Sequence, residues 1–443
     1  MNTLQKQEAF SAEAFAEQLE QWSDLPWLQA IKRKNWQAFE ALPQPKRSDE
    51  LWRYSSVRHT SLDGFKPATE PAIQDQEELI QRSNLVEHFA GRLVFADNYL
   101  IAENPVEQRL SDQGVIWTPI ERAFREYPEI IQKYLFDEST QLGSEKLLAL
   151  HHAFLKSGSL LYVPKNVSID LPLLAYYWAS DCEETVFPHT LLIAEENTKV
   201  NFVDFYNSRD PGCCPSMACG VGKIYAGAGA QVNRKIVQNW NDQTISFQIE
   251  SNFAKRDAQV KTVSVNLGSK YARLENQLTI EEPGASVKVY GLTVATEDRE
   301  FDQRTLQIHN AGNSFSDLLF KNALLDTSRT IFSGLIKVAE NAQKTDAYQS
   351  NRNLLLSPKA EACSMPGLEI AANDVKCSHG ATTGQLDTSE LFYMKARGIP
   401  EKAALELLVF GFFEEILEKI DNDELKPSLR EMLRNKFKTE STH

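Results

Sequence analysis

The sequence predicts a mainly β protein in which a β-solenoid core lies between a helical N-terminal region and a helical C-terminal region. Three observations lead to this prediction. Short segments of alternating apolar and polar residues fill the chain from Leu160 to about Cys377. A small-residue corner recurs between these segments at a nearly constant interval, and helical periodicity is confined to the two ends. With 443 residues, the chain is long enough for several domains or one elongated one.

The N-terminal region, placed at residues 1–157, is expected to be mainly helical. Ser23 and Pro26 suit the N-cap and first turn of a helix that ends before Pro43. A polar and aromatic stretch at residues 46–57 follows, and we expect it to begin a tether. A short strand is expected at residues 92–96, with further helices around residues 120–135 and 144–156.

The β core is placed at residues 158–380. Segments such as 245–249 (ISFQI) and 263–267 (VSVNL) have the period of two that half-buried strands require. The corner recurs at spacings of 32, 28, 27, 28 and 29 residues, beginning at Asn197, Gly229, Asp257, Gly284, Gly312 and Asn341. This pattern is typical of stacked coils, each of which buries its apolar face against its neighbours. An antiparallel sandwich or a pair of jelly rolls is the alternative, since their strands also recur regularly.

The C-terminal region, residues 381–443, returns to a helical pattern. Asp387 can cap one helix, Gly398 can end it, and Pro400 can open the next. Between Ala403 and Phe413 only Glu406 carries a charge. A helix that is apolar nearly all round must contact more than one layer, so this region is a candidate docking surface.

Composition and charge narrow the class of function. Asp and Glu outnumber Lys and Arg by 61 to 47, which gives a formal charge of −14 and argues against nucleic-acid binding. No apolar run approaches the length of a membrane-spanning helix, and residues 1–10 do not resemble a secretory signal. We therefore expect a cytoplasmic protein that binds no membrane and whose six cysteines are reduced.

Several catalytic and cofactor signatures are absent from the sequence. It contains no phosphate-binding P-loop, no H-E-x-x-H, no G-x-S-x-G and no dinucleotide fingerprint. The missing fingerprint leaves flavin binding without support. His151 and His152 face about 100° apart on a helix, a poor geometry for a shared metal. Cys213, Cys214 and Cys219 form no pair of zinc knuckles, and their role stays open.

One stretch combines metal-binding residue types at a useful spacing. Cys377 and His379 alternate, so on a strand both side chains lie on one face, within reach of one soft or borderline metal ion. Two donors do not close a tetrahedral site, so the others must come from elsewhere in the chain or from a partner. A buried thiol beside a histidine bonded to the backbone is the structural alternative. Cys363 could approach the same region if the strands stack.

Four ordered motifs in the C-terminal third resemble those of the SufB/SufD family. They are SNRNLLLS at residues 350–357, PGLEI at 366–370, DVKCSHGAT at 374–382 and LFYMKARGI at 391–399. The residues ALHHAF at 149–154 and GSLLYVP at 158–164 are similar to the family's entry into its β core. Gly380 stands where SufB proteins carry an acidic residue, so the chain resembles the SufD branch.

This resemblance implies a right-handed parallel β-helix and a non-catalytic scaffold for iron-sulfur cluster assembly. The implied partners are SufB, bound through the β-helix, and the ATPase SufC, bound through the C-terminal helices. The implied cargo is iron or a transient cluster shared with SufB, admitted at His379, with Cys377 as a less certain companion. The docking residues we select on the C-terminal helices are Leu391, Phe392, Tyr393, Arg397, Phe410 and Phe413.

Two other functions remain to be separated from this one. A carbohydrate-active β-helix lyase or hydrolase is the first alternative, and the missing secretion signal counts against it. A homodimer that stores or transfers iron is the second, and it would need ligands repeated across a two-fold axis. Whether isolated chains form homodimers is open at this stage.

Overall fold

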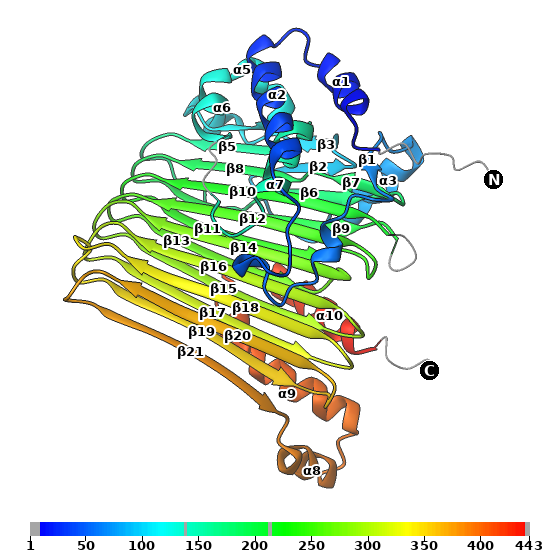
Figure 1. The fold of residues 1–443 in the computed structure, drawn as a ribbon, viewed down its shortest axis with the longest axis vertical. Helices are drawn as coiled ribbons and strands as arrows, with labels where there is room; N and C mark the ends of the chain where they lie inside the picture. The colour runs from blue at the N-terminus through cyan, green and yellow to red at the C-terminus, as the bar shows by residue number, and fades with distance from the viewer. Residues whose placement is uncertain (1–8, 137–139, 211–214, 439–443) are drawn as a thin grey trace.

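The computed structural model describes residues 9–136, 140–210 and 215–438. Its centre is a parallel β-helix of about eight coils, each made of one strand from each of two facing sheets. Figure 1 shows the coils stacked from the N-terminal helices at one end to β21 at the other. The predicted solenoid core is confirmed, and the antiparallel sandwich and jelly-roll alternatives are wrong.

The first sheet, called sheet A, runs from the N-terminal region to the last coil. Its strands are β4 (Ile116–Pro119), β5 (Ser159–Val163), β8 (His189–Ala194), β10 (Met217–Ala226), β12 (Ile245–Ala254), β14 (Tyr271–Ile280), β16 (Glu300–His309), β18 (Arg329–Val338) and β20 (Glu361–Ile370), with β1 (Lys66–Pro67) and β7 (Glu184–Val186) at its side.

The second sheet, sheet B, faces it and alternates with it along the chain. Its strands are β2 (Gly91–Ala96), β3 (Tyr99–Asn104), β6 (Leu173–Ala179), β9 (Lys199–Ser208), β11 (Gln231–Asn239), β13 (Gln259–Asn266), β15 (Ser286–Ala295), β17 (Phe315–Leu324), β19 (Asp346–Leu355) and β21 (Lys376–Gln385).

The coils repeat in register, which explains the regular corner in the sequence. Val232 pairs with Val260 and Val260 pairs with Val287, each in a parallel ladder. At the corner, Asn197, Gly229 and Asp257 have φ values of 56°, 67° and 56°, in the left-handed region. Glycine, asparagine and aspartate tolerate this region best, so the chain can turn tightly at the same place in successive coils.

The interior of the solenoid is mostly apolar but contains a buried ionic cluster. Arg234 Nε lies 2.6 Å from Asp204 Oδ2, and Arg234 Nη1 pairs with Glu250 Oε2; all three residues are buried. Thr190 Oγ1 donates to Asp204 at 2.7 Å, and Gln248 Nε2 donates to Glu250 at 2.6 Å. Gly222 leaves room for the cluster, because a Cβ there would lie 2.6 Å from Arg234 Nη1.

The N-terminal region contains more β structure than the sequence indicated. Its helices are α1 (Ala12–Glu20), α2 (Pro26–Ala41), α3 (Ile73–Arg82), α4 (Gln108–Asp112), α5 (Ile120–Glu126), α6 (Pro128–Tyr134) and α7 (Glu145–Phe154). Its strands extend the solenoid, because β2 pairs in parallel with β6 and β4 pairs antiparallel with β5. These strands form by pairing with segments that are distant in sequence. The local sequence pattern therefore predicted only the strand at residues 92–96.

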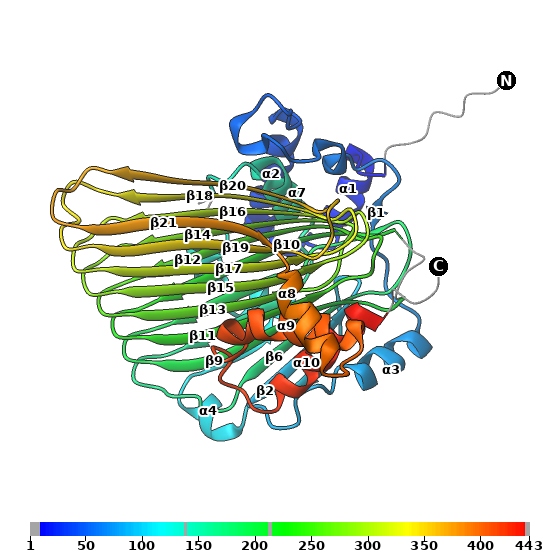
Figure 2. The same ribbon diagram turned by 90° about the horizontal axis from the view of Figure 1, so that it is seen from below.

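Three helices follow the last coil: α8 (Thr388–Ala396), α9 (Glu401–Leu417) and α10 (Leu425–Lys438). Figure 2 looks onto the last coil and shows them gathered beside sheet B. Val409, Phe413 and Leu429 belong to one buried cluster with Val263 and Leu292 of that sheet. The apolar faces of α9 and α10 therefore cover part of the outer face of sheet B. None of the helices in the described part of the chain is long and apolar enough to cross a membrane.

Candidate functional site

The candidate site lies on the last coil, made of β20 and β21. These strands are the terminal members of sheets A and B, and each pairs on one side only, with β18 and β19 respectively, within the described residues. In the described part of the chain, no further coil covers the side chains that point into the solenoid here. Leu368 and Ile370 are each 38% exposed although they are large and apolar. We call this surface the open end.

Cys377 and His379 share the inward face of β21, as their alternation predicted. They pair in register with Ala347 and Gln349, which are both buried on the inward face of β19. Cys377 packs against a buried cluster that includes Ala347 and Ile336, and burial raises the pKa of its thiol. His379 is exposed. The imidazole therefore faces solvent at the open end, while the thiol lies half-buried beneath the same surface.

No complete metal site lies within the described residues, because no three His, Cys, Asp or Glu side chains converge there. Cys363 does not join Cys377, since its register partner Ile331 alternates with the inward-facing Thr330 and Phe332. A cation at the open end would need donors beyond those that the described residues bring together there.

The remaining described cysteines differ in their burial and bonding. Cys219 is buried, and burial raises the pKa of its thiol. Cys219, Cys363 and Cys377 are free, but Cys182 in an exposed turn is disulfide-bonded, which corrects the expectation of six reduced thiols. Chain size argues against a disulfide framework but does not exclude a single surface bond. Cys213 and Cys214 lie outside the described residues.

A buried amide network supports the open end, and sequence reasoning missed it. Asn322 Nδ2 donates to Asn353 Oδ1 at 2.8 Å, and Asn353 Nδ2 donates to Asn351 Oδ1 at 2.8 Å. Ser364 Oγ on β20 also donates to Asn351 Oδ1, at 2.7 Å. The network joins the last three coils across both sheets. Its signal is the SNRN sequence at residues 350–353, whose alternate amides point inward.

The structure also brings His189 against the adjacent pair His151 and His152. His151 Nδ1 contacts the Cys219 carbonyl at 2.7 Å, and His151 Nε2 contacts His189 Nδ1 at 2.9 Å. Both ring nitrogens of His152 and Nε2 of His189 are buried without a hydrogen-bond partner. Burial lowers the pKa of all three, to about 3 for His151. Neutral imidazoles packed between α7 and sheet A are consistent with a structural role.

The selected docking residues divide into exposed and buried groups. Phe392 and Tyr393 on α8 are 73% and 60% exposed, and Arg397 Nη2 donates to Tyr393 Oη at 3.1 Å. No residue of α8 is buried. Leu391 and Phe410 are partly exposed, whereas Phe413 is 1% exposed against the solenoid. In this chain, Phe413 fastens α9 to sheet B, so we do not retain it as a docking residue.

Comparisons with known proteins agree with this architecture. Residues 177–412 match the family described as the SufBD core domain of SUF system FeS cluster assembly, and residues 8–174 match the SufBD protein N-terminal region. The chain is similar to the iron-sulfur cluster assembly protein SufD of Bacillus subtilis, at 26% identity over 93% of this chain and 94% of the relative. A SufBD family protein of Synechocystis is 28% identical over 88% of this chain and 87% of the relative. The chain therefore belongs to the SufB/SufD family of the SUF iron-sulfur cluster assembly system.

Proposed function

We propose that the chain is a SufD-type, non-catalytic scaffold subunit of the cytoplasmic SUF machinery. It pairs with a SufB subunit at the open end, binds the SufC ATPase through its C-terminal helices, and helps to admit iron. The observation that carries the proposal is the open end itself. Two metal donors, too few to complete a site, lie there on the last coil, whose two strands each have one uncovered edge. The printed name of the Bacillus subtilis relative, SufD, supports the choice of branch.

Strand pairing is the expected mode of contact with SufB. An uncovered strand presents unpaired amide and carbonyl groups, which readily bind a strand from another chain. The open end has two such strands, β20 and β21, together with the exposed Leu368 and Ile370. A partner that extends both sheets would bury these apolar side chains and satisfy the strand edges together.

Iron is the substrate in this proposal, and it would bind between the two subunits. The imidazole of His379 is a suitable ligand for Fe(II), and the thiolate of Cys377 for iron or a nascent cluster. Burial raises the pKa of the Cys377 thiol, which disfavours the thiolate in the isolated chain. His379 is therefore the first donor, and the partner must supply the others.

SufC is expected to bind at α8. No residue of this helix is buried, and Phe392 and Tyr393 are exposed to solvent. Exposed aromatic residues on one helix are typical of a binding surface. Figure 1 shows α8 beyond the last coil, so SufC and SufB would bind at the same end of the molecule.

Co-expression with SufB-like and SufC-like subunits, followed by mass measurement of the intact complex, tests both interfaces. Ile370→Asp is expected to abolish SufB binding, and Leu171→Asp, at an apolar residue 45% exposed away from the open end, is its matched control. Phe392→Asp is expected to abolish SufC binding, with Ile73→Asp on α3, 75% exposed, as control. Retention of both partners by Ile370→Asp and Phe392→Asp would contradict the assigned surfaces. Lyase or hydrolase activity on uronate polymers would favour the carbohydrate enzyme instead.

A further inference from the structure

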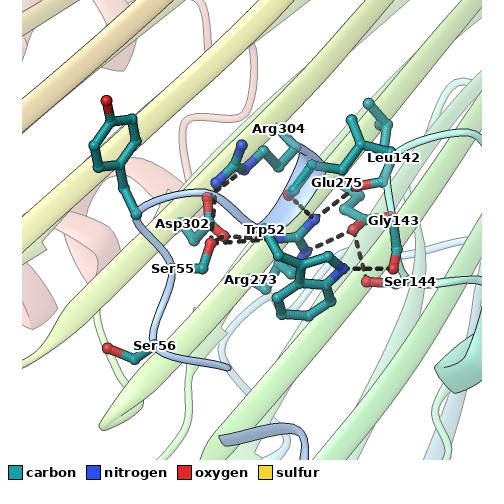
Figure 3. Close-up of polar contacts among 12 residues, drawn as sticks. Trp52, Ser55, Ser56, Leu142, Gly143, Ser144, Arg273, Glu275, Asp302 and Arg304 are labelled. Carbon is teal, nitrogen blue, oxygen red and sulfur yellow. Dashed lines mark hydrogen bonds and ion pairs between the residues drawn. The ribbon is translucent and has the colours of Figure 1, made fainter. Parts of the chain in front are cut away.

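Residues 46–57, which we call the strap, cross the outer face of sheet A. Figure 3 shows part of the strap lying over a row of charged side chains that point outward from β14 and β16. The row consists of Arg273, Glu275, Asp302 and Arg304, and all four are buried. In the sequence this stretch looks like a simple tether, but in the structure it covers charges that would otherwise face solvent.

The contacts between the strap and the row are almost all polar. Arg273 Nη2 donates to the Leu51 carbonyl at 2.9 Å, and Arg304 Nη2 donates to the Arg53 carbonyl at 3.1 Å. Ser55 Oγ donates to Asp302 and accepts from Arg304 Nη2 at 3.0 Å. Water can replace each of these partners, so their loss would leave no buried group unsatisfied once the strap has moved away.

The row would stay intact without the strap. Arg273 Nε lies 2.7 Å from Glu275, Arg273 Nη1 lies 2.5 Å from Asp302, and Arg304 Nε lies 2.6 Å from Asp302. The loop before α7 also holds the row, because the Leu142 carbonyl accepts from Arg273 at 2.6 Å. Opening of the strap would therefore hydrate a paired set of ions and would not separate them.

Few apolar contacts hold the strap closed. Trp52 is its main anchor: its ring lies 3.7 Å from the Arg273 guanidinium, and its Nε1 donates to the Gly143 carbonyl at 2.8 Å. Residues 46–51 are exposed. Tyr54 has a φ of 73°, a strained value for a residue with a bulky side chain.

Two clefts border the strap. One cleft, of about 1270 Å³, is lined by Pro45 and Val57 among others. The second, of about 420 Å³, is lined by Asp49 and Trp52. A segment that is held by polar contacts and one large apolar side chain, and that borders two clefts, is expected to open at low free-energy cost.

We infer that the strap is a salt-sensitive lid that opens without unfolding of the solenoid and exposes the Arg273–Asp302–Arg304 row. Opening exposes Arg273, Asp302 and Arg304, the three charged side chains that the strap contacts, to water. Mobile ions stabilise these charges there, so higher salt favours the open state. The closed state keeps this part of sheet A covered. This inference concerns the chain alone and does not depend on the assignment of SufB or SufC.

Hydrogen exchange of the full-length protein, followed by mass spectrometry of peptides covering residues 50–57, tests the lid. We expect these amides to exchange faster than those of β14 and β16, and their exchange rate to change little at low urea concentrations. We also expect the rate to be higher in about 0.5 M NaCl than in about 0.05 M NaCl. Ser55→Ala should accelerate their exchange by about tenfold, because it removes hydrogen bonds to charged groups. Ser48→Ala, in the exposed part of the strap, is the control and should change nothing.

Two outcomes would overturn the lid. One is exchange of the strap at the rate and urea dependence of β14 and β16, which would mean that it opens only in global unfolding. The other is exchange that is insensitive to salt in the wild-type protein. The salt comparison needs no variant, so it decides the question even if Ser55→Ala fails to fold.

Discussion

Arg234→Met is expected to destabilise the solenoid strongly, because Arg234 forms ion pairs with both Asp204 and Glu250. The substitution would leave these two buried carboxylates without that positive charge. All three side chains are at most 3% exposed, so water cannot replace the guanidinium. Breaking a buried ion pair by deleting one partner costs about 3–5 kcal/mol, since an unpaired charge stays buried. Because the entropy of unfolding grows with chain length, that cost corresponds to a fall in Tm of about 3–5 °C for a chain of this size.

The stability lost in Arg234→Met should also depend on pH. Burial already raises the pKa of Asp204 and Glu250, and removal of Arg234 would raise both further. A carboxyl whose folded-state pKa lies above its unfolded value contributes stability at low pH and loses it as pH rises through the folded pKa. The variant should therefore be closer to wild type at pH 5 than at pH 8.

Urea unfolding followed by circular dichroism at pH 5 and pH 8 measures both effects. Arg256→Met is the matched control, because Arg256 is exposed at a corner and the same substitution there should change stability little. A loss below about 1 kcal/mol for Arg234→Met, or a loss that is equal at the two pH values, would refute the reasoning.

Three further predictions follow from the packing. Gly222→Ala should lower the free energy of unfolding, measured in urea, by about 1–3 kcal/mol, because its Cβ would lie 2.6 Å from Arg234 Nη1. Gly384→Ala is the control and should leave this free energy nearly unchanged, since open space surrounds Gly384. Since burial lowers the pKa of His151, His152 and His189, their stabilising contribution is present above about pH 6.5 and is lost as pH falls. His152→Phe should flatten that pH dependence, and parallel stability curves would contradict this. Phe413→Asp should lower the Tm of the isolated chain, because it places a carboxylate in the buried contact between α9 and sheet B. A wild-type Tm would show that this contact is dispensable for stability.

The solenoid could be predicted because each coil uses the same local chemistry. Corner residues such as Asn197 and Gly229 are of types that tolerate the left-handed region, where their φ values lie. Within each strand, successive side chains point alternately into and out of the solenoid. The shared face of Cys377 and His379 follows from the same alternation. These features depend on residues close in sequence, so they are visible without a structure.

The features that the sequence did not reveal depend on distant partners. β4 forms because β5 lies beside it, and the His151–His189 contact joins a helix to a strand. Arg273 and Asp302 alternate outward and therefore look solvated, although the strap covers them. Phe413 is part of an unusually apolar helix, and only the packed structure shows which side of that helix meets sheet B.

Iron and sulfide content of the co-expressed complex, measured anaerobically, tests the central claim most directly. His379→Ala is expected to leave folding, partner assembly and ATPase stimulation intact while cluster content falls severely, and Cys377→Ser should lower it less. His88→Ala, an exposed histidine away from the open end, is the control and should keep wild-type loading. Wild-type cluster content in the His379→Ala complex would contradict the account and leave that residue without a role in iron entry.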